Sequence, residues 1–376
     1  MSDHYRPNYV EETNEEVNED YSNDDLFNIT SWGADPSFRE LITMYKEGEL
    51  IKPELQRKYV WDKVAASRFI ESLLLGLPVP SIFLAEGKDE TKLIIDGYQR
   101  IMTVYDFVGG IFSKDGKTFK LTNSDKINER WRGKAFNELS DTEQRKIKKS
   151  TIHAIIFVQN QPKDDDTSLF QIFERINTAG KSLTAQEIRN CVYQGCFNSL
   201  LFTLNEDKNW RILLGKEEAD PRMLDMEFIL RFFSLQDQSI LLDDKKQISL
   251  KKHLNTFMGN VTKGNIHIDA NSFSQVMSII NHSIGSAAFQ NWSEERNAFS
   301  GRFSPTIFDA ISIATAFANN SGIDCKNVLN RESHKELLIN DRFIEYTTKR
   351  TTNTEHIIGR IGLASNILYG LTYEKH

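Results

Sequence analysis

The sequence lacks the features that mark several large classes of protein. It has three cysteines, Cys191, Cys196 and Cys325, and this odd number without close pairing predicts reduced structural thiols instead of a disulfide framework. No apolar run approaches the roughly 20 residues that are needed to cross a bilayer. The acidic N-terminus has no apolar segment of the kind found in secretory signals. These absences predict a cytoplasmic protein that has no membrane partner.

The usual catalytic signatures are also missing. The sequence has no Walker A phosphate loop, no GxSxG elbow, no HExxH motif and no zinc-spaced set of Cys and His. Its eight histidines are scattered, so each is interpreted as a surface or structural residue. Any chemistry must then come from Arg, Gln, Asn, Tyr and carboxylates. These residue types suit phosphate binding and the stabilisation of transition-state charge better than covalent catalysis.

The composition describes a globular chain with one unusual end. With 376 residues, of which 39% are hydrophobic and 26% charged, the chain is long enough for two domains. The formal net charge is -7, but residues 1–25 contain nine acids and one base, so the rest of the chain carries only +1. We expect residues 1–28 to be an acidic, disordered tail. Its first 25 residues should be removable without loss of folding, because they offer little apolar surface to bury.

The pattern of apolar residues changes along the chain. Residues 29–190 interleave strand-like and helix-like patterns, whereas residues 191–376 show helical periodicity nearly throughout, for example at 223–233 and 272–284. We therefore expect an α+β core at 29–190, followed by a mostly α-helical domain at 191–376. The basic run from Arg145 to Lys149 follows a capping box, and we interpret it as a solvated helix face.

A strand, a sharp turn and a helix are predicted around residue 96. The apolar residues 93–95 end in Asp96 and Gly97, and helical spacing of apolar residues follows directly. Gln99 and Arg100 are then placed near a helix N-terminus, where free N–H groups and the helix dipole favour anions such as phosphate. Arg100 adds a planar cation that matches phosphate oxygens. The alternative is that Asp96 only forms the turn and Arg100 is a solvated surface residue.

Two further stretches carry polar side chains that suit an anion. Residues 51–61 form an extended stretch, and a polar turn near residue 180 joins two helices. For the second stretch, a simple helix–helix joint is the alternative. The candidate side chains in the two stretches are Gln56, Arg57, Tyr59, Arg175, Asn177 and Lys181.

Taken together, the three stretches resemble the N-terminal domain of GmrSD-type restriction endonucleases. That family is marked by a QRxYxW segment, a DGQQR motif and an FxRxNxxGxxLT segment, which correspond here to residues 56–61, 96–100 and 173–184. The resemblance covers roughly residues 35–195 and implies a ParB/sulfiredoxin-like α+β core with a role in bacterial defence against phage or foreign DNA. Two departures are that Tyr98 stands where the family usually has Gln, and that no HNH nuclease motif follows residue 200.

The resemblance to this family implies a function that the amino-acid composition alone does not indicate. Members are typically nucleotide-hydrolysing or nucleotide-sensing modules attached to a nuclease. We expect a component of an anti-phage or restriction-type defence system that binds and hydrolyses a nucleoside triphosphate, GTP or ATP, with Mg²⁺. One alternative is a non-enzymatic sensor or regulatory subunit that binds nucleotide or modified DNA and controls a partner nuclease. Another is a DNA endonuclease that acts through the ParB-like core. The expected partners are nucleotide, DNA, a partner nuclease or defence protein, and a second copy of the chain.

We expect the three stretches to converge on one anion pocket with Arg100 at its centre. Asp96 and Arg100 are the expected catalytic residues, and Asp96 is also the expected metal ligand. The expected nucleotide-binding residues are Gln56, Arg57, Tyr59, Gly97, Tyr98, Gln99, Arg100, Arg175, Asn177 and Lys181.

Overall fold

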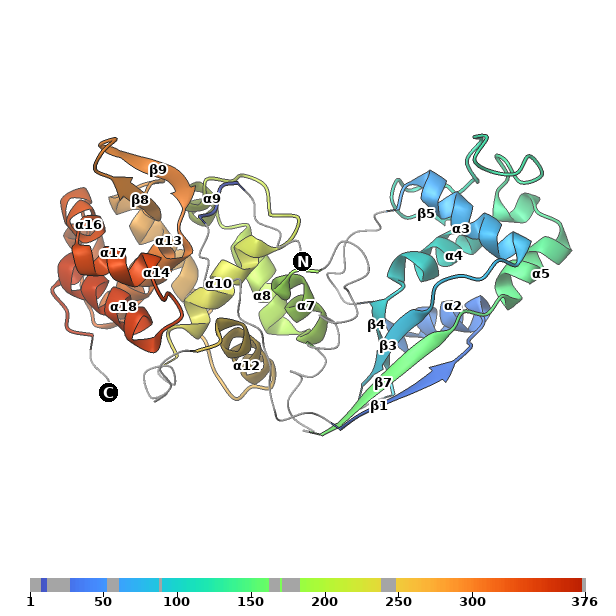
Figure 1. Ribbon diagram of the computed structural model, residues 1–376, viewed down its shortest axis with the longest axis horizontal. Helices are drawn as coiled ribbons and strands as arrows, with labels where there is room; N and C mark the ends of the chain where they lie inside the picture. Colours follow the sequence, from blue (N-terminus) through green and yellow to red (C-terminus); the bar gives the residue numbers. More distant parts are fainter. Residues whose placement is uncertain are drawn as a thin grey trace. The chain divides into compact units, whose positions relative to one another are not determined.

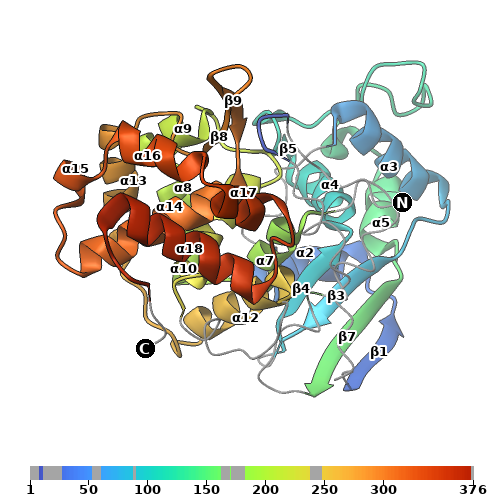
Figure 2. The ribbon, with the colours of Figure 1, turned by 60° about the vertical axis from the view of Figure 1, so that its left-hand side comes forward.

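The chain forms two compact units. The computed structural model describes residues 8–11, 28–52, 61–87, 90–161, 170, 183–237 and 248–373. Residues 25–181 and 190–192 form one unit, called here the sheet unit. Residues 1–24, 182–189 and 193–376 form the other, called here the helical unit. The α+β class predicted from the sequence is confirmed, since one unit carries a mixed sheet and the other consists mainly of helices (Figures 1 and 2).

The sheet unit is built on a five-stranded sheet with the order β1-β7-β3-β4-β2. β2 runs parallel to β4 and β3 runs parallel to β7, while the other neighbours are antiparallel. The strands are β1 Asn28–Ala34, β2 Leu50–Ile51, β3 Ile82–Glu86, β4 Lys92–Asp96 and β7 Ala154–Gln161. Two short strands, β5 Ile111–Phe112 and β6 Lys117–Thr118, pair separately.

One face of the sheet packs against helices (Figure 1). The helices are α2 Phe38–Glu47, α3 Lys63–Leu75, α4 Tyr98–Gly109 and α5 Asp141–Lys149, with the short η1 Phe136–Glu138 before α5. Their apolar side chains, such as Phe38, Ile70 and Val104, form one core with Leu84 and Ile94 of the strands. Side-chain caps mark where α2, α3 and α5 begin, because Ser37, Asp62 and Ser140 accept hydrogen bonds from N–H groups that a first turn leaves unpaired.

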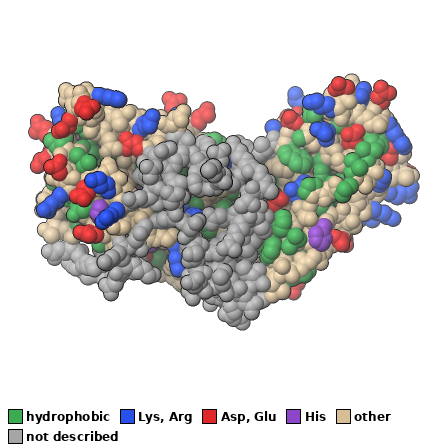
Figure 3. Space-filling model, in the orientation of Figure 1, with side chains coloured by type: hydrophobic (Ala, Val, Ile, Leu, Met, Phe, Trp, Pro, Cys, Tyr) green, Lys and Arg blue, Asp and Glu red, His purple; other side chains and the backbone are tan. Residues whose placement is uncertain are grey.

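The basic run predicted at residues 145–149 lies on α5. Ile147 is its buried residue, while Arg145, Lys146 and Lys149 are exposed. Lys148 places its ammonium 5.1 Å from the centre of the Phe136 ring. Figure 3 shows that Lys and Arg side chains on the visible face of the sheet unit are interspersed with Asp and Glu. This arrangement agrees with a solvated helix face.

The helical unit contains α7, except for its last residues 190–192, which belong to the sheet unit, the helices from α8 to α18 and one hairpin. Its helices are α7 Ala185–Val192, α8 Cys196–Asn205, α9 Lys208–Leu214, α10 Leu224–Ser234, α12 Leu250–Thr262, α13 Ser272–Ser283, α14 Pro305–Asn320, α15 Cys325–Val328, α16 Arg331–Leu338, α17 Asp341–Thr348 and α18 Thr354–Tyr369. The hairpin consists of β8 Gln290–Ser293 and β9 Ala298–Phe303. α14 is buried along most of its length and packs against α18 (Figure 2). None of the helices in the described ranges has the length and apolar character to cross a bilayer.

A buried ion cluster joins three helices of this unit. Asp309 of α14 accepts from Arg231 of α10, with Nη2–Oδ2 at 2.5 Å, and from Arg360 of α18, with Nη2–Oδ2 at 2.9 Å. All three side chains are almost fully buried. Removing charges from water is unfavourable unless they are paired and hydrogen-bonded, so this cluster constrains how the three helices pack.

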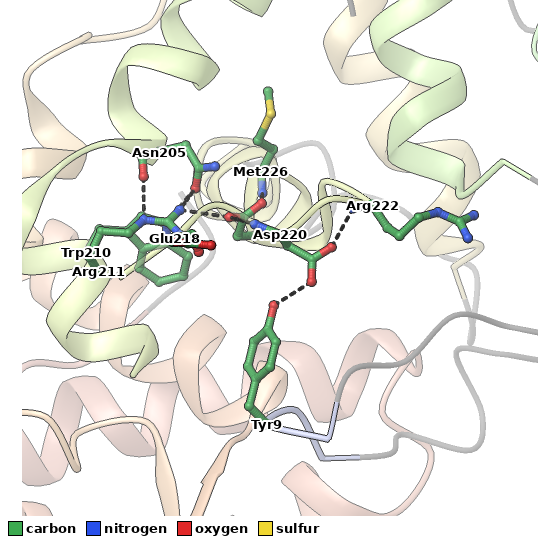
Figure 4. Close-up of polar contacts among 9 residues, drawn as sticks. Tyr9, Asn205, Trp210, Arg211, Glu218, Asp220, Arg222 and Met226 are labelled. Atoms are coloured by element: carbon green, nitrogen blue, oxygen red, sulfur yellow. Dashed lines mark hydrogen bonds and ion pairs between the residues drawn. The ribbon is translucent and has the colours of Figure 1, made fainter. Parts of the chain in front are cut away.

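Part of the acidic N-terminal segment is docked on the helical unit. Val10 is buried and forms a parallel bridge with Phe303, supported by hydrogen bonds from Phe303 N to Tyr9 O and from Glu11 N to Phe303 O. The Tyr9 hydroxyl donates to Asp220 Oδ2 at 2.8 Å (Figure 4). Burial raises the pKa of the Glu11 carboxyl above its usual value. The expectation of a disordered tail is therefore wrong at these three residues, because Val10 does bury apolar surface.

Candidate functional site

The predicted strand, turn and helix around residue 96 are confirmed. β4 ends at Asp96, Gly97 follows, and α4 begins at Tyr98. Gly97 has φ 101°, a conformation that side chains disfavour. A Cβ atom at this position would also lie 2.2 Å from Cγ2 of Ile82. Both facts explain why the turn requires glycine.

Arg100 joins the turn to the neighbouring strand. Its Nη2 donates to Asp96 Oδ2 at 3.0 Å, and its Nη1 donates to the carbonyl oxygen of Ser81 at 2.6 Å. The Arg100 side chain is 17% exposed and the Asp96 side chain 41% exposed. Arg100 therefore holds a structural position between β3 and β4, while Asp96 keeps one side open to solvent. Oδ1 of Asp96 has no hydrogen-bond partner in the part of the chain that the structure describes.

One edge of the sheet gathers the polar groups of this site. Asp96 ends β4, and Lys52 directly follows β2, which is parallel to β4, so both lie where these strands end. Ser81 precedes β3, which runs antiparallel to β4 and therefore begins at the same edge. The carboxyl ends of parallel strands are the usual place for ligands in open sheets with helices.

Lys52 is a cation that the sequence did not single out. Its Nζ lies 5.1 Å from the centre of the Tyr98 ring, at the start of α4. Burial lowers the pKa of the Lys52 ammonium. Lys52 has no carboxylate partner among the described residues. Tyr98 is buried, so its ring supports this cation and is not an open platform for a base.

Gln99 connects two of the three predicted stretches. Its side-chain oxygen accepts a hydrogen bond from the backbone N–H of Trp61 at 3.2 Å. Trp61 is the last residue of the first stretch and packs edge-on against Phe69 of α3. The carbonyl oxygen of Trp61 accepts from Lys114 Nζ at 3.4 Å. The structure thus brings the end of the first stretch to the first turn of α4.

The remaining predicted ligands lie outside the described residues. They are Gln56, Arg57 and Tyr59 of the first stretch and Arg175, Asn177 and Lys181 of the third. Their convergence with Arg100 stays a prediction. Lys52 and the Ser81 carbonyl are additional groups at this edge. The weak sequence signal for Lys52 was its place directly before Pro53, because a residue that precedes proline is biased to an extended backbone.

The Asp96–Arg100 turn fits a magnesium ion that is bound together with phosphate, but not one that is held by protein side chains alone. The described residues contain no group of three or more His, Cys, Asp or Glu side chains that could hold a metal ion by themselves. Mg²⁺ at phosphate sites is usually held by one or two carboxylates together with the phosphates of the substrate. The half-exposed Asp96 carboxylate meets that requirement only when a nucleotide supplies the other ligands.

Comparisons with known proteins confirm the resemblance that the sequence suggested. Residues 38–194 match the family model described as GmrSD restriction endonuclease, N-terminal domain. This range contains β2 to β4, β7, α2 to α5 and α7, and so includes the whole Asp96–Arg100 turn. A search of curated proteins found no match.

Proposed function

With residues 38–194 matched to the GmrSD N-terminal domain, we propose that this region is the nucleoside-triphosphate-binding module of a restriction-type defence protein. The observation that carries the proposal is the sheet edge described above. It places two cations, Lys52 and Arg100, and one half-exposed carboxylate, Asp96, at the first turn of α4. A helix N-terminus with cations beside it attracts phosphate.

Each group has a distinct proposed role. Arg100 contacts phosphate oxygens with guanidinium donors in a fixed plane, and Lys52 adds a mobile point charge. Asp96 is the protein ligand of a nucleotide-bound Mg²⁺, and in hydrolysis it orients the attacking water. The N–H groups at the start of α4 lie where phosphate oxygens are favoured, since Gly97 offers no capping side chain.

The test is binding of non-hydrolysable GTP and ATP analogues with Mg²⁺, measured by calorimetry. Arg100→Ala should weaken binding by about 1.5–3 kcal/mol, the range for charge-assisted hydrogen bonds, and Arg100→Lys should rescue it only partly. Arg145→Ala, which removes an exposed Arg of α5, is the matched control and should leave binding unchanged.

A melting curve of each variant separates the two roles of Arg100. Since Arg100 bonds to Ser81 and Asp96, some loss of stability is expected as well. Unchanged triphosphate affinity together with a lower melting temperature would show that Arg100 serves the fold alone, and the proposal would fail.

A sensor without hydrolysis is the second candidate, because Asp96 is already paired with Arg100. Phosphate release from GTP and ATP with Mg²⁺, with and without DNA, distinguishes the candidates. Tight triphosphate binding without phosphate release would favour the sensor that controls a partner nuclease.

A further inference from the structure

The helical unit contains a hollow that the proposed function does not use. It has a volume of about 350 Å³ and lies between the β8–β9 hairpin and α16; we call it the hairpin pocket. The side chains that decide its chemistry are Trp292 and Phe299 of the hairpin and Arg331, His334 and Lys335 of α16. β8 and α16 are in contact, and the hairpin projects beside this helix (Figure 1).

Three aromatic rings form one wall of the hairpin pocket. Phe299 stacks on His334 with ring centres 6.0 Å apart and planes at 22°. Trp292 meets Phe299 edge-on, with ring centres 5.0 Å apart. Phe299 remains 37% exposed, although a large apolar ring is usually buried in a core. The exposed ring offers a flat apolar surface that a planar ligand can cover.

Two cations stand beside the rings. Arg331 and Lys335 are one helical turn apart on α16 and therefore lie on the same face. Lys335 Nζ lies 4.4 Å from the centre of the Trp292 ring, and Arg331 Nε donates to the carbonyl oxygen of Ile284. Neither cation has a carboxylate within ion-pair distance among the described residues. The pocket therefore favours a ligand that carries negative charge.

His334 contributes a neutral ring to this wall. Its Nε2 donates to the carbonyl oxygen of Ala288 at 2.9 Å, which assigns the proton to that nitrogen when the ring is neutral. Burial lowers the pKa of His334 to about 4, so the ring carries no charge at neutral pH. The positive charge of the pocket therefore comes from Arg331 and Lys335, and the rings provide stacking surface.

We propose that the hairpin pocket binds a nucleotide, with the base against Phe299 and the phosphate at Arg331 and Lys335. Aromatic faces next to cations are the combination by which proteins hold bases and their phosphates. The volume is within the range of small-molecule sites. The ligand is a free mononucleotide or one nucleotide of a single strand, since both present the same base and phosphate.

The experiment uses the full chain and two probes, a nucleoside 5′-monophosphate and a single-stranded oligodeoxynucleotide of about 12 residues. Binding is measured by calorimetry for the first and by fluorescence anisotropy for the second. Phe299→Ala should weaken binding about tenfold or more, because one base loses its stacking partner. Lys335→Gln should weaken it several-fold and reduce its salt dependence. The control variants Ile344→Ala and Lys326→Gln remove an exposed apolar residue and an exposed cation elsewhere in the unit.

The outcomes separate the two sources of the ligand. If the monophosphate binds and both pocket variants weaken its binding, the ligand is a free nucleotide. If only the oligonucleotide binds and both variants weaken its binding, the ligand is a single strand. The proposal is overturned if neither probe binds, or if both pocket variants bind as tightly as the controls. Arg100→Ala should leave this binding unchanged, and Phe299→Ala should leave triphosphate binding to the sheet unit unchanged. Failure at one site is therefore distinct from failure at the other.

Discussion

Gly97 gives the sharpest test of how the sequence positions the candidate site. Replacing it by alanine requires a non-glycine residue at φ 101°, which costs about 1–2 kcal/mol. The new Cβ would also lie 2.2 Å from Cγ2 and 2.8 Å from Cβ of Ile82. Ile82 is fully buried and its N–H is bonded to His153 O, so it has little room to retreat. Overpacking adds about 1–3 kcal/mol, and we expect Gly97→Ala to destabilise the sheet unit by about 2–5 kcal/mol in total.

The matched control lies at the other end of the same helix. Gly110 has φ 86°, but no atom lies within 4 Å of the position that a Cβ would take, so Gly110→Ala should lose only the conformational term of about 1–2 kcal/mol. Urea unfolding followed by circular dichroism measures both variants. The steric reasoning is refuted if Gly97→Ala is no more destabilising than Gly110→Ala. In an Ile82→Ala background the penalty of Gly97→Ala should shrink, because the closest atom is gone.

Three further predictions concern the helical unit. Asp309→Asn should destabilise it by about 3–5 kcal/mol, since two buried Arg side chains lose their shared carboxylate; chemical unfolding checks this, and a change below about 1 kcal/mol would contradict it. Tyr9→Phe should lower the free energy of unfolding by about 1–2 kcal/mol, because buried Asp220 loses a hydrogen-bond donor. Deletion of residues 1–11 should lower stability as well, and thermal unfolding measures both changes. For His334, whose pKa is lowered to about 4, the folded state prefers the neutral ring. As the pH falls from about 6.5 to 4, the wild type should therefore lose about 1.4 kcal/mol of unfolding free energy per pH unit relative to His334→Gln. Stability profiles of the two proteins that run parallel over this pH range would disprove the prediction.

Local chemistry explains why parts of the structure were predictable. The change from β4 to α4 at Gly97 follows from an apolar run, a turn residue and helical spacing that are adjacent in sequence. The capping boxes at Ser140–Glu143 and Thr184–Glu187 are present as the residue types predict, because both partners lie within one turn. In each case the interacting groups are separated by only a few residues.

Long-range pairing explains what the sequence could not reveal. Asp309 pairs with Arg231 and Arg360, which lie 78 and 51 residues away, and nothing in the local pattern identifies these partners. Lys52 reaches the candidate site only because β2 pairs parallel to β4. Val10 is buried although two acids, Glu11 and Glu12, follow it in the sequence, and its backbone partner, Phe303, lies almost 300 residues away.

The contacts of Arg100 determine how its proposed role must be tested. One Nη donates to Ser81 O and the other to Asp96, so the guanidinium is held in place before any ligand arrives. A fixed guanidinium loses little side-chain entropy when it binds phosphate, which favours affinity. The guanidinium has five N–H donors and these two bonds use two of them, so the other donors remain for a phosphate. Removing Arg100 therefore acts on the fold and on the proposed site together, and only affinity and stability measured on the same variants assign the effect to one of them.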